Sequence, residues 1–239
     1  MKKFIIENKN YSLEEIYDIG TNNYQILLSK DAKNNIIKSR EVIDVKLKSN
    51  ETIYGINTGF GKLSQIKIDK NDINQLQKNL ILSHAVGIGS YIPDDIVRLI
   101  ILLKVISFTK GHSGIRIEVV DALLKLLNAG CLPMIPSKGS VGASGDLAPL
   151  AHMSLALLGI GKVKYNNEIV NTEIVFKKIK MIPIILEAKE GLALINGTQF
   201  STAYGVYCLY HLQNLMKISD ISSSMTIEAL QCSKKPFLK

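Results

Sequence analysis

The sequence lacks an apolar run long enough to cross a bilayer. Its most apolar stretch, LIILLKVISF at 99–108, is short and is interrupted by Lys104. The first ten residues, MKKFIIENKN, hold too few apolar side chains for a signal-peptide core. Hydrophobic residues nevertheless make up 46% of the 239 positions, enough to build a substantial core. We therefore expect a soluble, cytoplasmic protein that does not bind membranes.

Cysteine is also scarce. Cys131, Cys208 and Cys232 lie far apart and form no C-x-x-C pair, which favours a reducing compartment and packing roles. The four histidines show no metal-ligand spacing either. We expect no metal site.

Arginine is rare in a chain whose formal net charge is +8. Only Arg40, Arg98 and Arg116 are present, and the lysines are spread singly along the chain. Nucleic-acid readers concentrate arginine for base contacts or interleave aromatic side chains with positive charge. Neither pattern occurs, so we expect no nucleic-acid partner. The phosphate-binding motifs G-x-x-x-x-G-K-[ST] and G-x-G-x-x-G are absent as well.

The apolar spacing predicts a mainly α fold with a small mixed α/β region near the N-terminus. Extended segments are expected at 24–28 and 51–54. Helices are expected from Asp69, from Pro93, over 117–129, after Asp146 as N-cap, along 190–218 and from Ser222. We divide the chain into residues 1–190 and a helical segment, residues 191–239, which starts a longer bundle.

The stretch GSVGASGDLAPL at 139–150 is the most informative in the chain. Three glycines permit positive φ and close backbone approach. One use of that freedom is a phosphate cradle, but Asp146 places negative charge where an anion would bind. Another is self-condensation: the Gly145 amide nitrogen attacks the Ala143 carbonyl, and two waters leave, one with the Ser144 hydroxyl. The product is an electrophilic ring, which no ordinary side chain provides.

Five blocks give this stretch its context: TIYGINTGFG at 52–61, LILSHAVGIG at 80–89, GHSGIR at 111–116, KGSVGASGDLAPLAHMSL at 138–155 and KEGLALINGTQ at 189–199. In these blocks and in their order, the chain resembles the aromatic amino-acid ammonia-lyase family. The resemblance implies that Ala143, Ser144 and Gly145 form 4-methylideneimidazole-5-one, with no external cofactor. It also implies the helical fold shared with the fumarase and aspartase proteins.

The same resemblance assigns roles to other positions. Tyr54 matches the tyrosine that removes the β-proton of the substrate, although a phenol with a pKa near 10 needs nearby positive charge to act as a base. Asn196 matches the asparagine near the ring and the substrate; a purely structural polar network is the alternative. The pair Ser83 and His84 matches members that act on L-histidine, because an imidazole can exchange a hydrogen bond with a second imidazole.

The resemblance implies elimination of ammonia from L-histidine to give trans-urocanate, or a tyrosine-type lyase or aminomutase reaction. Family members are about twice as long as this chain. Their second half supplies a carboxylate-binding arginine, a second tyrosine, a glutamate and most of the bundle that forms homotetramers. We therefore expect a homo-oligomer or a C-terminal partner half. An inactive fragment, or a module that binds phosphate or nucleic acid, stays open as an alternative.

Overall fold

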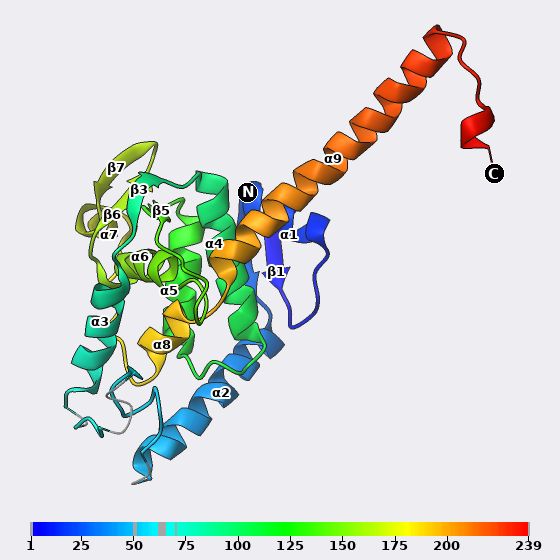
Figure 1. The fold of residues 1–239 in the computed structure, drawn as a ribbon. Helices are drawn as coiled ribbons and strands as arrows, with labels where there is room; N and C mark the ends of the chain where they lie inside the picture. The colour runs from blue at the N-terminus through cyan, green and yellow to red at the C-terminus, as the bar shows by residue number, and fades with distance from the viewer. Residues whose placement is uncertain (1, 50–51, 62–65, 70, 239) are drawn as a thin grey trace.

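The computed structural model describes residues 2–49, 52–61, 66–69 and 71–238. It is mainly α, as expected (Figure 1). The helices are α1 (Leu13–Thr21), α2 (Lys30–Lys48), α3 (Ile73–His84), α4 (Asp94–Thr109), α5 (Ile117–Asn128), α6 (Leu147–Leu155), α7 (Thr172–Ile179), α8 (Glu190–Ile195) and α9 (Gln199–Ala229). Short 3₁₀ turns cover Ala156–Leu158 and Lys235–Phe237.

The described residues also form three small sheets around the helices. The first pairs β1 (Lys2–Ile6) with β2 (Tyr24–Leu28) in parallel. The second pairs β3 (Ile88–Tyr91) with β5 (Pro136–Lys138) in antiparallel fashion. The third is antiparallel and joins β4 (Leu132–Pro133), β6 (Lys162–Tyr165) and β7 (Glu168–Asn171). These sheets tie the ends of the helices together, and the helices supply most of the core.

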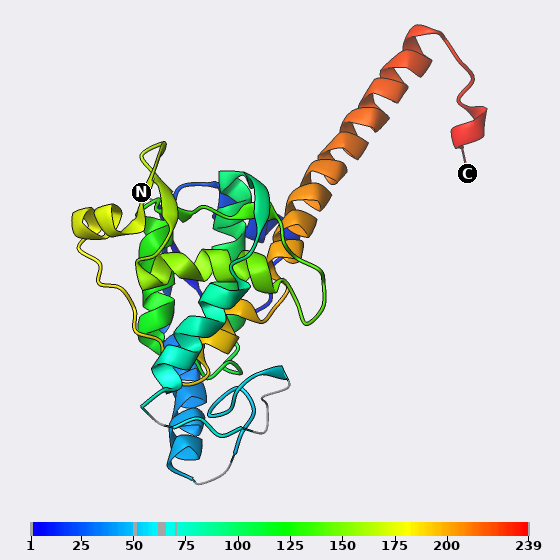
Figure 2. The same cartoon turned by 60° about the vertical axis from the view of Figure 1, so that its left-hand side comes forward.

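The core is centred on α4, whose apolar residues surround the helix on all sides. Leu99, Ile100, Ile101 and Leu102 follow one another in sequence, and all four are fully buried. A helix that is apolar all round is expected to be enclosed by its neighbours. In the structure α4 packs against α1, α5 and α9 (Figures 1 and 2). It therefore connects the N-terminal elements to the last helix.

Two helices in the first third were not predicted. Helix α1 begins with a capping box in which Ser12 and Glu15 satisfy each other's backbone amides. Helix α2 is capped by Ser29, whose side chain accepts from the Ala32 amide. Most of α2 is polar, and only one narrow stripe is buried, so its apolar periodicity is weak.

Several predicted boundaries were wrong. Helix α3 begins at Ile73 and not at Asp69. Residues 52–54 form no strand, and position 51 lies outside the described residues. The segment 190–218 is broken at Asn196, between α8 and α9. No new helix begins at Ser222, because α9 continues through it to Ala229.

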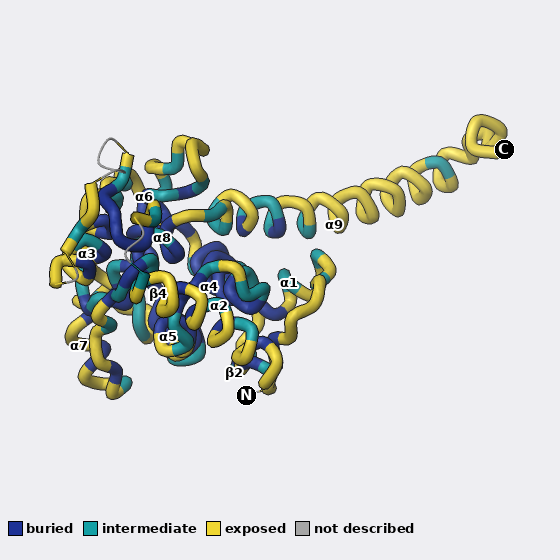
Figure 3. The backbone as a smooth tube through the Cα atoms, turned by 90° about the horizontal axis from the view of Figure 1, so that it is seen from below, coloured by how far each residue is buried: buried dark blue, intermediate teal, exposed yellow. Residues whose placement is uncertain are grey.

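The C-terminal part of α9 projects from the body of the molecule (Figure 2). Figure 3 shows that this part is exposed along its length. Its exposed apolar residues include Leu209, Leu212, Leu215, Met216, Ile218, Ile221 and Met225. In the described part of the chain, no helix is both long and apolar enough to span a membrane.

Candidate active site

The predicted ring tripeptide lies in a turn immediately before α6. Ala143 and Ser144 are exposed at this turn. Ser144 has φ of +60° and Gly145 has φ of +101°. A positive φ at a residue with a side chain is uncommon and is usually imposed by the surrounding structure. The bend and the exposure both fit a peptide that condenses on itself.

The backbone of Gly145 is paired with that of Gly197, in the turn between α8 and α9. The two residues form an isolated parallel bridge. The next amide, that of Asp146, donates to the Gly197 carbonyl oxygen at 2.7 Å. A Cβ on Gly145 would collide with the backbone of Gly197. Glycine is therefore required at the third position of the tripeptide by the packing as well as by φ.

Asp146 fixes the other side of the turn. Its buried carboxylate accepts hydrogen bonds from the Ser140 hydroxyl at 2.7 Å and from the Ser201 hydroxyl and amide at 2.7 and 2.8 Å. We predicted that Asp146 caps α6; it does occupy the N-cap position, but its side chain makes no capping bond. The carboxylate instead joins the tripeptide loop to the first turn of α9.

Asn196 lies at the C-terminal end of α8, beside Gly197. Its backbone carbonyl accepts a hydrogen bond from the Lys104 ammonium at 2.8 Å. Its side chain is exposed and has no hydrogen-bond partner among the described residues. The amide is thus available to a ligand next to the tripeptide.

A buried ion cluster holds α8 in place. Glu190 is fully buried and accepts from the Arg116 guanidinium at 2.7 and 2.8 Å. The Arg40 guanidinium lies 3.8 Å from the same carboxylate. The hydrogen bonds that Arg116 donates to the Glu190 carboxylate raise the pKa of Arg116. No role was predicted for Glu190; its sequence signals were its place in the KEGLALINGTQ block and at the start of an apolar helix.

Ser83 and His84 end α3. His84 Nδ1 lies 2.8 Å from the Leu80 carbonyl oxygen and 3.2 Å from the Ser83 hydroxyl. A carbonyl oxygen can only accept, so Nδ1 must carry a proton. In the neutral ring, Nε2 is then an acceptor. The Ser83 hydroxyl donates to Leu80 as well, at 3.1 Å.

A histidine from α6 fixes the segment that follows His84. The Gly87 amide donates to His152 Nε2 at 3.0 Å. Burial lowers the pKa of His152, which favours the neutral ring that this bond requires. Gly87 also lies against Gly139, where a side chain would crowd the backbone. The end of α3 is therefore packed on the strand that leads into the tripeptide loop.

Tyr54 lies in the loop that precedes Gly55 and packs against α8. Its side chain is 56% exposed, and its ring meets that of Phe60 edge-on, with centroids 6.0 Å apart. Its hydroxyl has no hydrogen-bond partner in the described ranges. The adjacent Gly55, at φ of +74°, packs against Leu192 of α8.

The predicted site residues lie on connected segments, but they are not all in contact. The tripeptide is joined to the Asn196 turn through Gly197. Tyr54 and His84 are connected to these segments through adjacent glycines: Gly55 packs against Leu192 of α8, and Gly87 packs against Gly139. No hydrogen bond among the described residues links Tyr54 or His84 to the tripeptide. No group of three or more potential metal ligands occurs in the described part of the chain.

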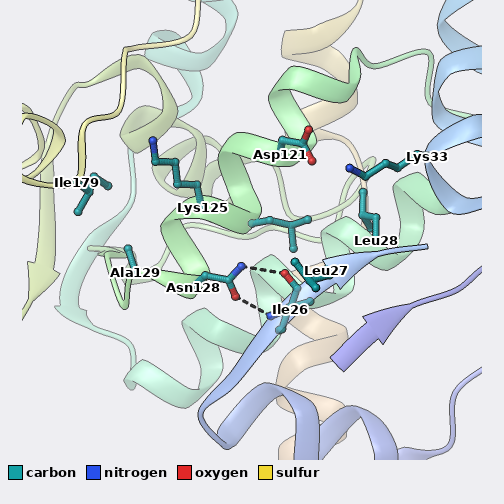
Figure 4. A pocket seen from close by; sticks show the side chains of 10 residues that line it. Ile26, Leu27, Leu28, Lys33, Asp121, Lys125, Asn128, Ala129 and Ile179 are labelled. Carbon is teal, nitrogen blue, oxygen red and sulfur yellow. Dashed lines mark hydrogen bonds between the residues drawn. The ribbon is translucent and has the colours of Figure 1, made fainter. Parts of the chain in front are cut away.

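An open cavity of about 670 Å³ lies elsewhere, between β2 and α5 (Figure 4). The Asn128 side chain bonds both backbone groups of Ile26 there and so satisfies the free edge of β2. Lys33 and Asp121 also line this cavity. None of the predicted site residues does.

Residues 11–239 match the family described as aromatic amino acid lyase. The chain belongs to this family. The aromatic amino acid lyase named histidine ammonia-lyase from Alkaliphilus oremlandii is 46% identical over 229 residues, which are 96% of this chain and 45% of that protein. The chain spans about half the length of the curated relatives it matches.

Two solved structures of similar proteins have the same fold as this chain. The histidine ammonia-lyase of Trypanosoma cruzi superposes with a TM-score of 0.90 at 36% identity, covering 98% of this chain and 46% of its own. The phenylalanine aminomutase of Pantoea agglomerans superposes with a TM-score of 0.93 at 32% identity, covering 100% and 46%. The predicted family and the predicted helical fold are thus confirmed.

Proposed function

We propose that this chain contributes to a histidine ammonia-lyase, which removes ammonia from L-histidine without oxidation and releases trans-urocanate. The observation that carries the proposal is the pairing of the Ala143-Ser144-Gly145 turn with the turn that presents Asn196. The curated relatives named histidine ammonia-lyase support the choice of substrate.

The tripeptide would become 4-methylideneimidazole-5-one. A bond forms between the Gly145 nitrogen and the Ala143 carbonyl carbon, and the two dehydrations remove the Ala143 oxygen and the Ser144 hydroxyl. The positive φ values at Ser144 and Gly145, together with the absence of room for a Cβ at Gly145, support this assignment. When formed, the ring supplies an electrophile. The tripeptide precedes the N-terminus of α6, where the helix dipole would stabilise negative charge that develops on the ring.

The other residues would bind substrate and move its proton. Tyr54 would accept the β-proton, and its exposed hydroxyl is free to approach a ligand. His84 Nε2 would accept the N–H of the substrate imidazole, because the Leu80 carbonyl holds the proton on Nδ1. The Asn196 amide would hold the substrate beside the tripeptide. The match of Ser83 and His84 to members that act on L-histidine supports L-histidine over L-tyrosine as the substrate, as do the relatives named histidine ammonia-lyase.

The site would be completed by further protein. Exposed apolar residues along α9 and the exposed Tyr54 ring support burial against other helices, in a homotetramer or against a C-terminal half. We propose that residues 1–190 form the ring-bearing part and that residues 191–239 form the start of a helical bundle. The cytoplasm is the compartment we propose, because exposed free thiols at Cys208 and Cys232 fit a reducing environment.

A complementation assay tests this function. The chain is co-expressed with the C-terminal half of the Alkaliphilus oremlandii relative, and urocanate absorbance is followed after adding L-histidine. We expect turnover that is abolished by Tyr54→Phe. Parallel assays with L-tyrosine and L-phenylalanine test the tyrosine-type alternative. Absence of turnover with all three substrates, from a purified and folded complex, would favour an inactive fragment and contradict the proposal.

A further inference from the structure

Lys104 is a charged residue in the most apolar part of the molecule. It lies in the middle of α4, and its side chain is only 1% exposed. The ammonium lies 5.3 Å from the centroid of the Phe108 ring. No salt bridge joins it to any carboxylate in the described part of the chain. Burying an ammonium without a counter-charge is unfavourable, so its retention at this position requires a reason.

The contacts of Lys104 give that reason. Nζ donates to the backbone carbonyl of Asn196 at 2.8 Å and to the side-chain oxygen of Gln199 at 3.3 Å. Both acceptors belong to the α8–α9 turn, residues 196–199. Desolvation lowers the pKa of Lys104 to about 7. Its amine has hydrogens for both contacts in either protonation state.

The α8–α9 turn also holds the ring tripeptide in place, because the backbone of Gly145 pairs with that of Gly197. Gly197 lies between the two acceptors of Lys104, and its carbonyl accepts from the Asp146 amide at 2.7 Å. The Gln199 side-chain oxygen lies so close to the Gly197 α-carbon that a Cβ there would collide with it. Lys104 thus holds a side chain and a backbone group on either side of the residue that pairs with Gly145.

We propose that Lys104 is a positioning residue that fixes the α8–α9 turn through its hydrogen bonds to Asn196 and Gln199. The Ala143-Ser144-Gly145 loop and the Asn196 side chain then keep the alignment that ring closure needs. This inference rests on the proposed function. The lysine makes no hydrogen bond to any of the three tripeptide residues and is connected to them through Gly197. Its effect should therefore appear first as local order in the two paired segments.

Hydrogen exchange measures that order whether or not the ring forms. Lys104→Met keeps an unbranched apolar side chain but loses the hydrogen-bond donors. In this variant we expect the amide exchange rates of residues 141–147 and 196–202 to rise by at least about tenfold, whereas the amides of α5 should stay protected. Ser107→Ala is the matched control, because it removes a hydroxyl from the same helix that bonds only the Lys104 backbone carbonyl. Its exchange should match that of the wild type in all three segments.

A second variant keeps the inference testable if Lys104→Met fails to fold. Gln199→Leu removes one acceptor at the start of α9, outside the apolar core, and should raise exchange at residues 141–147 by a smaller factor. Unchanged exchange there in a folded Lys104→Met, or in Gln199→Leu when Lys104→Met does not fold, would overturn the inference. A uniform rise that includes α5 would also overturn it, because it would show only general loss of stability.

Intact mass separates this inference from the proposed function. In the co-expressed complex, the fraction of chain that has lost two waters should fall at least several-fold in Lys104→Met and recover in Lys104→Arg, which restores N–H donors. Equal fractions in wild type and Lys104→Met would contradict a role in ring closure. If the wild type itself loses no water, the proposed function fails, and the exchange data still decide whether Lys104 orders the turn.

Discussion

Gly145 and Gly197 face each other across a backbone bridge, although they belong to different segments of the chain. The bridge joins the loop that holds the predicted prosthetic-group precursors to the turn that holds Asn196. Neither glycine has room for a Cβ: one would meet the opposing backbone and the other the Gln199 side chain. The chemistry proposed for this protein depends on that pairing, and the first prediction tests it.

Gly145→Ala should disrupt the site. Its Cβ would collide with Gly197 at a φ of +101°, so we expect a loss of unfolding free energy of about 3 kcal/mol or more. Gly142→Ala is the matched control: φ there is also positive, at +68°, but its Cβ would meet nothing within 4 Å. Only the conformational cost of about 1 kcal/mol should remain. Urea unfolding measures the loss of unfolding free energy in both variants. Equal losses would contradict the close contact between Gly145 and the Gly197 backbone.

Glu190→Gln should release α8 and with it the turn at Asn196. The carboxylate is fully buried against Arg116, and removing its charge breaks the buried part of this ion cluster, which should cost about 3 kcal/mol of unfolding free energy. Glu187→Gln serves as control, because Glu187 also contacts Arg116 at 2.8 Å but is 42% exposed. Its loss should stay below about 1 kcal/mol. Chemical denaturation that ranks the two variants in the opposite order would disprove this account of α8.

His152 should make stability depend on pH. Its folded-state pKa lies below the unfolded value because the ring is buried, and its Nε2 accepts from Gly87. The unfolded state therefore takes up a proton first as the pH falls. Stability from this residue should be complete above about pH 6.5 and decline below it. In His152→Asn the loss of unfolding free energy between pH 7.5 and pH 5 should be smaller; an identical pH slope in both proteins would reject the prediction.

His84→Leu should change substrate preference in the co-expressed complex. Loss of the Nε2 acceptor should raise KM for L-histidine about tenfold, the effect of one hydrogen bond, with little change for L-tyrosine. Gln75→Ala, which alters an exposed residue of α3 whose side chain donates a hydrogen bond to Asn79, should leave both values unchanged. Steady-state kinetics with the two substrates provides the measurement. A parallel rise for both substrates would show that His84 does not read the imidazole.

Motif blocks allowed the family, the helical fold and the ring tripeptide to be predicted, because each block combines glycines and polar residues in an unusual order. Burial could not be predicted in the same way. Lys104 interrupts an apolar run and was interpreted only as a reason against a membrane span. Its contacts with Asn196 and Gln199 appear only when α4 and α9 pack together. The buried role of Glu190 was missed for the same reason.

Tertiary hydrogen bonds and weak periodicity explain two further differences. Asp146 has the residue type and position of an N-cap, yet its carboxylate is bonded by Ser140 and by the distant Ser201. Tertiary hydrogen bonds replaced the local one that the sequence favoured. Helix α2 was overlooked because one buried stripe on a polar helix leaves little periodic signal.

Intact-mass spectrometry of the chain, co-expressed with the C-terminal half of the Alkaliphilus oremlandii relative, tests the central claim most directly. We predict that the wild-type chain has lost two waters, that the loss lies in the peptide containing residues 143–145, and that Ser144→Ala restores the full sequence mass. A wild-type chain of unmodified mass in a folded complex would contradict the claim that Ala143, Ser144 and Gly145 form the electrophile.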